Sequence, residues 1–179
     1  MSGTKLLVTD RLVLRKVTMN DAHDLFINWA SDIKTNEYLT FKCHDTEETT
    51  KKVISYWLKK YEENGFEWCI EIKDTKEVIG VISANTSYKY NTLEIGYSIS
   101  SKYWNKGYTT ESVKAIIDYL FNECNYNIIE AIIPSDNIGS IKVAEKCGMK
   151  LEATLKDRYK NKLTGKMNNL LIYSIFNNN

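Results

Sequence analysis

The pattern of apolar residues changes period within one short stretch of this chain, and this change constrains the fold more than any other feature. Residues 93–99 alternate between apolar and other side chains, which is the period of a β-strand. Residues 113–124 carry apolar side chains every three or four positions, which is the period of one helix face. A short turn, residues 104–110, lies between them and contains a lysine and a glycine. The sequence therefore predicts a strand, a tight turn and a helix in immediate succession.

The turn before the predicted helix points to a ligand that carries phosphate. A helix that begins after a glycine turn has backbone N–H groups without partners in its first turn. The same end of the helix carries the positive pole of the helix dipole. Together these features favour a phosphate or pyrophosphate group. We therefore expect such a ligand at residues 104–110.

The composition is that of an ordinary globular domain and argues against two kinds of partner. Hydrophobic residues make up 43% of the 179 residues, so one domain spanning residues 1–179 has enough apolar side chains for a sizeable core. The formal net charge is +1, whereas nucleic-acid-binding domains usually show a marked basic excess. No stretch approaches the ~20 apolar residues of a membrane span. We therefore expect neither stable nucleic-acid binding nor membrane insertion.

The cysteines and the first residues of the chain predict a cytoplasmic protein. The chain opens without a long apolar run, so no signal peptide is expected. Its four cysteines are scattered without a CxxC pair and there are two histidines, so no metal is expected. Cys124 and Cys147 fall in apolar patterns and are expected to be reduced core thiols. Reduced thiols are typical of the cytoplasm.

The elements predicted along the chain are, in order, one strand, helices, three strands, a helix, a strand, a helix and two strands. This order predicts an α/β (α+β) fold with a mixed, mostly antiparallel twisted sheet flanked by helices. Strands are expected at residues 11–17, 66–73, 78–85, 93–100, 128–134, 149–155 and 169–176, and the helices outside the stretch described above at 20–30, 32–39, 46–64 and 136–146. The helix that follows its cap Thr46 is expected to bury Val53, Trp57, Leu58 and Tyr61.

A second motif, SDNIGSIKVAEKCGM, follows the predicted strand 128–134 and begins a helix. Ser135 or Asp136 is expected to cap this helix. Asn137 and Ser140 lie three positions apart, so both face one side of its first turn. Their amide and hydroxyl groups are able to hold a polar ligand, but such residues at a helix start are more often caps. Both interpretations stay open from the residues alone.

The two motifs together resemble the GCN5-related N-acetyltransferase (GNAT) superfamily. The residues that carry the resemblance are EIGYSISSKYWNKGYTTES and, further along, NIGSIKVAEKCGM. The opening residues LLVTDRLVLRKVTMNDAHDL are similar to the Rim-type ribosomal-protein N-acetyltransferases and their polyamine and antibiotic relatives. The resemblance extends from Thr9 to Ile175. It implies the GNAT fold, in which the sheet splays between the fourth and fifth strands.

The resemblance implies acetyl-CoA as the acetyl donor. Its pyrophosphate would lie on backbone N–H groups of the turn, and its pantetheine arm would enter between the strands 93–100 and 128–134. The N–H of Ile99 would polarise the thioester carbonyl, and Asn137 would hold the arm from the other side. The residues expected to contact acetyl-CoA are Ile99, Ser100, Trp104, Asn105, Lys106, Gly107, Tyr108, Thr109, Thr110, Asn137 and Ser140.

Departures from the family pattern change the expected proton donor. Many members carry a Tyr general acid seven residues after the Asn of the second motif, and here that position is Ala144. In the Rim-type subgroup the Ser of an Asn-x-x-Ser motif protonates the departing thiolate, and Ser140 matches it. In the turn, Thr109 stands where a small residue is usual, so it either adds a hydroxyl donor or crowds the ligand. No cysteine matches a nucleophile of the family, so no acetyl-cysteine intermediate is expected.

Three residues are expected to meet the acceptor amine. Glu94 lies on the strand that would line the cleft and is the candidate catalytic base. An exposed strand residue without a catalytic role is the alternative interpretation of Glu94. Tyr38 and His44 fall in the region that borders the acceptor in this family.

Glu111, in the first turn of the helix after the phosphate turn, is expected to be structural, because a carboxylate there complements the helix dipole.

The sequence therefore predicts direct acetyl transfer from acetyl-CoA to a primary amine in a ternary complex. The amine is a protein N-terminal α-amine, such as that of a ribosomal protein, or a polyamine or aminoglycoside. A CoA-binding module without catalysis is the alternative, because of Thr109 and Ala144. A P-loop nucleotidase is disfavoured, since the turn lacks the Gly-x-x-x-x-Gly-Lys-Ser/Thr spacing. The resemblance allows a homodimer, and the near-neutral charge favours none of the acceptors.

Overall fold

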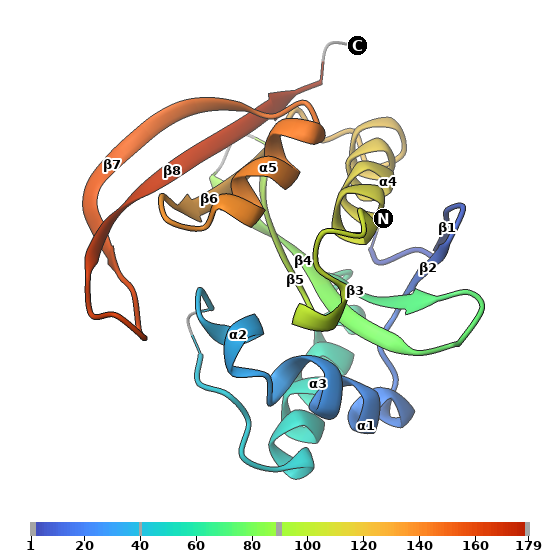
Figure 1. Cartoon of the computed structure of the whole chain (residues 1–179). Coiled ribbons are helices and arrows are strands. Elements are labelled where there is room, and N and C mark those ends of the chain that lie inside the picture. The colour runs from blue at the N-terminus through green and yellow to red at the C-terminus, as the bar shows by residue number, and fades with distance from the viewer. Residues whose placement is uncertain (1–2, 40, 89–90, 178–179) are drawn as a thin grey trace.

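The computed structural model describes residues 3–39, 41–88 and 91–177 and shows one sheet of eight strands with helices on both faces (Figure 1). The strands lie in the order β1-β2-β3-β4-β5-β6-β8-β7, and every neighbouring pair is antiparallel except β5 and β6. This confirms the predicted mixed, mostly antiparallel sheet. The strands are β1 (Leu7–Val8), β2 (Leu12–Arg15), β3 (Phe66–Ile72), β4 (Val78–Tyr88), β5 (Thr92–Ile99), β6 (Ile128–Pro134), β7 (Lys150–Lys160) and β8 (Met167–Phe176). The α-helices are α1 (Ala22–Leu25), α2 (Ile33–Asn36), α3 (Glu47–Glu62), α4 (Tyr108–Asn122) and α5 (Ile138–Lys146).

Two apolar cores, one on each face of the sheet, follow from the alternation of side chains along the strands. On β3, Trp68 and Ile70 belong to the core that is shared with α4 and α5, whereas Cys69 belongs to the core that is shared with α1 and α3. Figure 1 shows α4 and α5 together at one side of the central strands and α1, α2 and α3 at the other. The four cysteines are free; Cys147 is buried in the core, as expected, whereas Cys124 is partly buried against it. None of the helices in the described residues is long and apolar enough to cross a membrane.

The parallel strands β5 and β6 separate soon after they meet. They pair only where Thr92–Glu94 faces Ile128–Glu130. Beyond this point β6 continues its pairing with β8, whereas β5 continues its pairing with β4. The second half of β5 therefore has an unpaired edge that faces a gap in the sheet. This is the predicted splay between the fourth and fifth strands of the sequence analysis, and the gap positions the site described below.

The helix predicted for residues 20–30 is interrupted. It consists of α1 followed by a π-helical turn at Phe26–Ala30, in which Ser31 N donates to Phe26 O at 3.1 Å. The turn presents Asn28 and Trp29 to the sheet: Asn28 Nδ2 donates to Val78 O (3.2 Å), and Trp29 Nε1 donates to Ser98 Oγ (2.9 Å). The periodicity of apolar residues could not predict these two polar contacts, because both partners lie far away in the sequence.

The apolar face predicted for α3 is partly wrong. Thr46 caps the helix, as expected, but the buried residues are Thr50, Ile54 and Trp57, and Leu58 is 37% exposed. The predicted set combined positions from two adjacent faces of the helix, and only one of these faces packs against the sheet.

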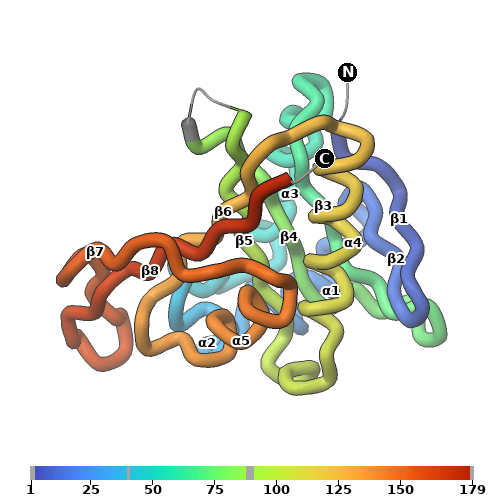
Figure 2. Tube along the Cα trace, turned by 90° about the horizontal axis from the view of Figure 1, so that it is seen from above, coloured from blue at the N-terminus to red at the C-terminus, as the bar shows by residue number. Residues whose placement is uncertain are grey.

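The final hairpin is longer than predicted. Strand β7 extends to Lys160, and together β7 and β8 project from the rest of the sheet at the end opposite β1 and β2 (Figure 2). The sequence predicted only residues 149–155 for the first strand, because the charged residues that follow carry no apolar alternation. Backbone pairing with β8, up to the aligned pair Lys160–Met167, extends the strand instead.

Candidate active site

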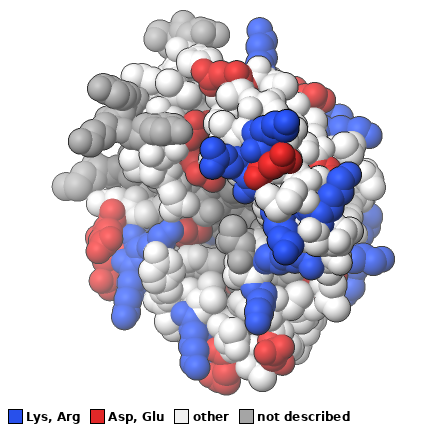
Figure 3. Space-filling model, turned by 90° about the vertical axis from the view of Figure 1, so that its left-hand side faces the viewer, with Lys and Arg blue, Asp and Glu red and all other residues white. Residues whose placement is uncertain are grey.

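A cavity of about 540 Å³ lies at the gap between β5 and β6. Its walls come from α2 and the residues after it, the end of β5, the turn before α4, the first turn of α4, and α5 with the residues before it. Figure 3 shows a hollow near the centre of this face of the molecule, with Lys and Arg side chains gathered to its right. The predicted site residues that line the cavity are Tyr38, Ile99, Trp104, Asn105, Gly107, Thr109, Thr110, Asn137 and Ser140.

The end of β5 turns one backbone N–H group, that of Ile99, toward the gap in the sheet. Ser100 N donates to Ile79 O at 2.8 Å, next to the aligned pair Gly80–Ile99. Because bonded and non-bonded pairs alternate in an antiparallel ladder, Ile99 turns its N–H and C=O away from β4 and toward the gap. The carbonyl oxygen of Ile99 accepts a hydrogen bond from Trp104 Nε1 (2.9 Å). The N–H of Ile99 thus faces the side on which β5 has no partner strand.

The turn between β5 and α4 is held in a conformation that favours glycine. Gly107 has φ +82° and Asn105 has φ +60°, both in the left-handed region. Arg11, which immediately precedes β2, stabilises the turn, because its Nη1 donates to Lys106 O at 3.0 Å. The same guanidinium forms an ion pair with Glu111 at 2.7 Å.

Glu111 is a structural residue, as expected. Its carboxylate accepts hydrogen bonds from Thr9 Oγ1 (2.6 Å), Arg11 N (2.9 Å) and Arg11 Nε (2.7 Å). Burial opposes ionisation, but these donors outweigh burial and lower the pKa of Glu111. The hydrogen bonds of Glu111 therefore connect the start of α4 to the residues before β2.

The first turn of α4 presents free backbone donors to the cavity. The first main-chain bond of the helix runs from Glu111 N to Gly107 O (3.0 Å). The N–H groups of Tyr108, Thr109 and Thr110 therefore have no acceptor within the helix. Thr109 and Thr110 line the cavity, so these donors and the positive end of the helix dipole face it. This is the arrangement expected for a phosphate site.

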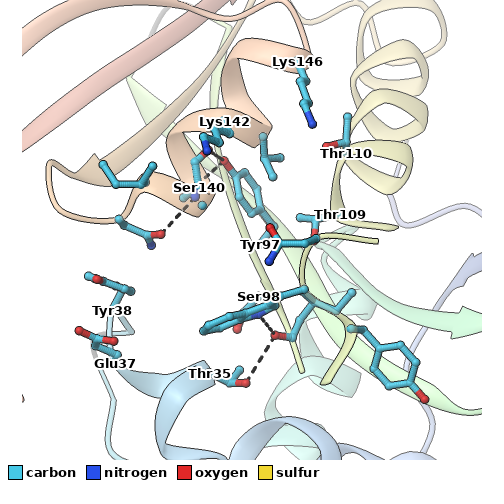
Figure 4. A pocket seen from close by; sticks show the side chains of 18 of the residues that line it. Thr35, Glu37, Tyr38, Tyr97, Ser98, Thr109, Thr110, Ser140, Lys142 and Lys146 are labelled. Atoms are coloured by element: carbon cyan, nitrogen blue, oxygen red, sulfur yellow. Dashed lines mark hydrogen bonds between the residues drawn. The ribbon is translucent and has the colours of Figure 1, made fainter. Parts of the chain in front are cut away.

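Asn137 and Ser140 have different roles at the start of α5. Asn137 is the cap, because its Oδ1 accepts a hydrogen bond from Ser140 N at 3.1 Å. Neither Ser135 nor Asp136, the caps predicted from the sequence, takes this position. The Ser140 side chain is free of the cap and donates from Oγ to Tyr97 OH at 3.0 Å (Figure 4). The structure thus assigns the cap to Asn137 and leaves the Ser140 hydroxyl outside the cap.

Tyr97 is one of the cavity residues that the sequence analysis did not assign to the site. It lies on β5 and donates from its hydroxyl to Ser140 O (3.0 Å) while it accepts from Ser140 Oγ. Burial raises the pKa of Tyr97. The alternation along β5 marked this side chain only as apolar, and no local signal links it to Ser140, which lies 43 residues further on. Ala144, the position at which many family members carry the Tyr general acid, is fully buried.

The two ends of the cavity differ in charge. Lys146 extends from α5 toward Thr110 at one end and Lys142 lies on the same helix beside Ser140, whereas Glu37 and Tyr38 lie at the other end (Figure 4). Tyr38 OH donates to Asp136 O at 3.3 Å. Burial, followed by the charge of Glu37, raises the pKa of Tyr38 to about 12, so the phenol stays protonated. One end therefore suits an anion and the other a cation.

Side chains of the β7–β8 hairpin hold Glu37 and Asp136 at the acidic end of the cavity. Asn161 Nδ2 lies 3.1 Å from both Glu37 Oε1 and Asp136 Oδ2, and Asn168 Nδ2 donates to Asp136 Oδ2 at 2.6 Å. These amides hold the carboxylates without neutralising them, and no ion pair within the described residues includes Glu37 or Asp136. A cationic ligand at this end would meet uncompensated negative charge.

Two residues predicted to meet the acceptor do not line the cavity. Glu94 lies near the start of β5, in register with Glu130 of β6 and Asn85 of β4. Burial, followed by the charge of Glu130, raises the pKa of Glu94. His44 is buried in the core beside α3, where its Nδ1 lies 2.9 Å from Thr50 Oγ1 and burial lowers its pKa.

Three residues predicted to contact acetyl-CoA also lie outside the cavity lining. Ser100 is fully buried, and its Oγ has no hydrogen-bond partner among the described residues. Lys106 and Tyr108 lie in the turn, but their side chains pack elsewhere: Lys106 Nζ lies 4.7 Å from the ring centre of Tyr103, and the Arg11 guanidinium lies 4.5 Å from that of Tyr108.

Comparisons with known proteins identify the family. Residues 11–150 match the model of the acetyltransferase (GNAT) domain. The uncharacterized N-acetyltransferase YoaA of Bacillus subtilis (strain 168) is 31% identical over 152 residues, which cover 84% of this chain and 86% of that protein. The chain therefore belongs to the GNAT family of acetyltransferases, enzymes that take an acetyl group from acetyl-CoA.

Solved structures agree with the fold. An acetyltransferase of the GNAT family from Bacillus anthracis superposes with a TM-score of 0.85 at 24% identity, over 98% of this chain and 100% of that chain. The ribosomal L7/L12 alpha-N-protein acetyltransferase RimL, solved in complex with coenzyme A, superposes with a TM-score of 0.80 at 18% identity, over 96% of this chain and 98% of that chain. At these identities the likeness concerns the fold.

Proposed function

We propose that this chain acts as one N-acetyltransferase domain that moves the acetyl group of acetyl-CoA directly to a primary amine in a ternary complex. The observation that carries the proposal is a single cavity that joins the free edge of β5 to the N-terminus of α4. A strand edge suits an extended amide chain such as pantetheine, and a helix N-terminus suits its pyrophosphate. The fit of these two features to one ligand supports acetyl-CoA.

The basic end of the cavity would hold the phosphates. The pyrophosphate accepts hydrogen bonds from the backbone N–H groups that begin α4, and Lys142 and Lys146 add positive charge nearby. Backbone donors do not depend on side-chain identity, so Thr109 does not prevent this binding and its hydroxyl is a further donor.

The unpaired N–H of Ile99 would polarise the thioester carbonyl. In the reaction the amine nitrogen forms a bond with the carbonyl carbon, and negative charge develops on the carbonyl oxygen. A backbone donor aimed at that oxygen stabilises this charge more than it stabilises the substrate. The pairing of β5 with β4 leaves Ile99 with this donor, and the rigid strand holds it in place.

Ser140 would assist the leaving group. When the C–S bond breaks, the electron pair goes to sulfur, and the amine loses a proton to a base. A hydroxyl that donates a hydrogen bond to the sulfur stabilises the thiolate at that moment. Ser140 lines the cavity from α5, and Asn137 fixes the backbone at this point as the helix cap.

The acidic end of the cavity would receive the amine. Glu37 supplies negative charge for an ammonium group, and Tyr38 supplies a protonated hydroxyl beside it. Protein N-terminal α-amines, polyamines and aminoglycosides all carry such a group. RimL, which shares the fold, is named as an acetyltransferase of a ribosomal protein, and this supports including N-terminal peptides of ribosomal proteins among the acceptors.

Two carboxylates compete for the role of base. Glu94 has the pKa that suits the role, since a raised carboxylate pKa brings proton uptake nearer to neutral pH. Its position outside the cavity lining requires a water relay. Glu37 has the position, because it lines the acceptor end. We propose Glu94 with a water relay, as the sequence predicted, and treat Glu37 as the competing assignment.

The experiment that tests the proposal separates binding from turnover. Calorimetric titration with acetyl-CoA is expected to show saturable binding and a raised melting temperature. Release of free thiol is then measured with spermidine, kanamycin and N-terminal peptides of ribosomal proteins as acceptors. Absence of binding at millimolar acetyl-CoA would refute the proposal. Binding without thiol release from any acceptor would instead support a CoA-binding module without catalysis.

A further inference from the structure

Two hydroxyl groups from distant parts of the chain form a reciprocal pair inside the cavity wall. Tyr97 O–H donates to the carbonyl oxygen of Ser140, and Ser140 O–H donates to the Tyr97 hydroxyl oxygen, both at 3.0 Å (Figure 4). Tyr97 lies on β5 and Ser140 lies in the first turn of α5. The pair therefore bridges the gap between the strand edge and the helix that form the two sides of the cavity.

The two hydrogen bonds fix different parts of Ser140. The bond to the Ser140 carbonyl holds the backbone of the first helical turn against β5, and the cap from Asn137 holds the N–H of the same residue at 3.1 Å. The bond from Ser140 Oγ favours the side-chain rotamer in which the hydroxyl reaches Tyr97 OH. A side chain held in one rotamer loses no further conformational freedom when a ligand arrives.

We propose that Tyr97 is a positioning residue for Ser140: its hydroxyl holds the serine in the orientation from which Oγ–H reaches the thioester sulfur. The inference rests on the proposed function, since it concerns the leaving group of acetyl-CoA. Ser140 exchanges one acceptor, the Tyr97 oxygen, for another, the sulfur on which charge develops as the C–S bond breaks. The proton stays on Oγ, so the step requires no proton from Tyr97.

Direct action of Tyr97 on the sulfur is the weaker alternative. Its hydroxyl hydrogen already serves the Ser140 carbonyl, and breaking that bond would loosen the helix turn. Burial raises the pKa of Tyr97, so the phenol does not give up its proton near neutral pH. The surroundings thus suit Tyr97 as a fixed support and leave Ser140 Oγ–H as the group that donates to the sulfur.

The test is a double-mutant cycle on the full-length chain with Tyr97→Phe, Ser140→Ala and the double variant. Phenylalanine retains the ring that packs against the core and removes both hydrogen bonds. We expect kcat to fall about fivefold to tenfold in Tyr97→Phe, which is the scale of one hydrogen bond. The KM for acetyl-CoA is expected to stay within about twofold, because the loss falls on the transition state. In the Ser140→Ala background, Tyr97→Phe is expected to cause no further loss of kcat.

Tyr173→Phe is the matched control. Tyr173 is also buried, its hydroxyl lies 3.4 Å from Glu145 Oε1 on the same helix α5, and it does not line the cavity. This variant removes a tether between the sheet and α5 away from Ser140. We expect its kcat to equal that of the wild type, even where its melting temperature is lowered.

The assay uses acetyl-CoA with the fastest acceptor among spermidine, kanamycin and the ribosomal-protein peptides, or water if none of them reacts. Effects on kcat that multiply in the double variant would overturn the positioning role, as would an unchanged kcat in Tyr97→Phe. A kcat loss of the same size in Tyr173→Phe would reduce the effect to general loosening of α5 and would also overturn it. Failure of the wild type to bind acetyl-CoA would refute the proposed function itself and is visible before any variant is made.

Discussion

Trp104 Nε1 donates a hydrogen bond to the carbonyl oxygen of Ile99 at 2.9 Å. The bond joins the turn before α4 to the end of β5, and both segments line the same cavity. Thr35 Oγ1 reaches the same carbonyl oxygen at 3.5 Å. The two parts proposed to hold acetyl-CoA, the phosphate turn and the strand edge, are therefore fixed relative to each other by a side chain of the turn itself.

Trp104→Phe tests this connection. The variant keeps an aromatic ring but removes the indole donor, so the turn is less firmly held to the strand. We expect the free energy of unfolding to fall by about 1 kcal/mol and acetyl-CoA affinity to fall about threefold to tenfold. Urea unfolding and calorimetric titration measure the two quantities. Wild-type affinity in this variant would mean that the Arg11 contacts alone hold the turn.

Gly107→Ala tests the turn conformation. At φ +82° a Cβ is strained, and the added atom would lie 3.3 Å from Arg11 Nη2. We expect a stability loss of about 1 kcal/mol or more together with weaker acetyl-CoA binding. Gly165→Ala is the control, because Gly165 has φ +68°, does not line the cavity, and in the described part of the chain only its own and its neighbours' atoms come within 4 Å of an added Cβ. Its stability is expected to fall similarly while its acetyl-CoA affinity stays unchanged.

Asn137→Ala and Ser140→Ala are expected to differ in kind. Asn137 is the cap of α5, so its loss should cost about 1 kcal/mol of stability. Ser140 Oγ takes no part in the cap, so its loss should lower kcat with little change in melting temperature. Thermal melting and kcat measured on the same preparations decide the matter. A lowered melting temperature with full kcat in Ser140→Ala would leave the thiolate without help from this side chain.

Glu94→Gln and Glu37→Gln together identify the base. The variant that removes the base is expected to lose about 10²-fold or more in kcat at neutral pH. It should also lose the dependence of rate on pH that ionisation of the carboxylate produces, while acetyl-CoA affinity is retained. We expect this pattern for Glu94→Gln. If instead Glu37→Gln shows it and Glu94→Gln behaves as the wild type, the base lies at the acceptor end and Glu94 is structural.

Glu111→Gln should destabilise the protein in a pH-dependent way. The pKa of Glu111 is lowered in the folded state, so its contribution is complete above its ordinary value of 4.5 and is lost as pH falls through the folded pKa. We expect a loss of about 1–2 kcal/mol at pH 7 and a smaller difference from the wild type below pH ~4. Urea unfolding at both pH values measures it, with Glu62→Gln, at an exposed position of α3, as the control. An equal difference at both pH values would contradict the role of the charge.

The parts of the fold that local sequence signals predict correctly are those in which one element packs along a single face. Strand β6 was predicted with its exact bounds because a continuous apolar run leaves no other interpretation. The strand, turn and helix of residues 93–124 were predicted because the period changes at a glycine. The face of α3 was mispredicted, since two adjacent faces of that helix both carry apolar residues and the sheet covers one.

Most of the predicted site residues line one cavity, and the structure places the others outside its lining. Residues from both motifs line the cavity, because backbone donors at a helix start and a strand edge are local properties. His44 and Glu94 were placed in the acceptor region by position in the chain, and the fold puts His44 into the core and Glu94 beside Glu130. The acidic end formed by Glu37 and Asp136 depends on amides from the β7–β8 hairpin, which no local pattern indicates.

The sequence by itself determined the strand, glycine turn and helix around Gly107 and the mixed sheet, because periodicity and turn chemistry act between residues that are close along the chain. The tertiary structure alone decided at which residue β5 and β6 separate, that Trp104 donates to Ile99, and that Tyr97 meets Ser140. These contacts form between groups whose meeting depends on how far the sheet twists and where the helices pack on it. The physical reason is that a hydrogen bond between distant residues leaves no periodic trace in the sequence, whereas burial of one face does.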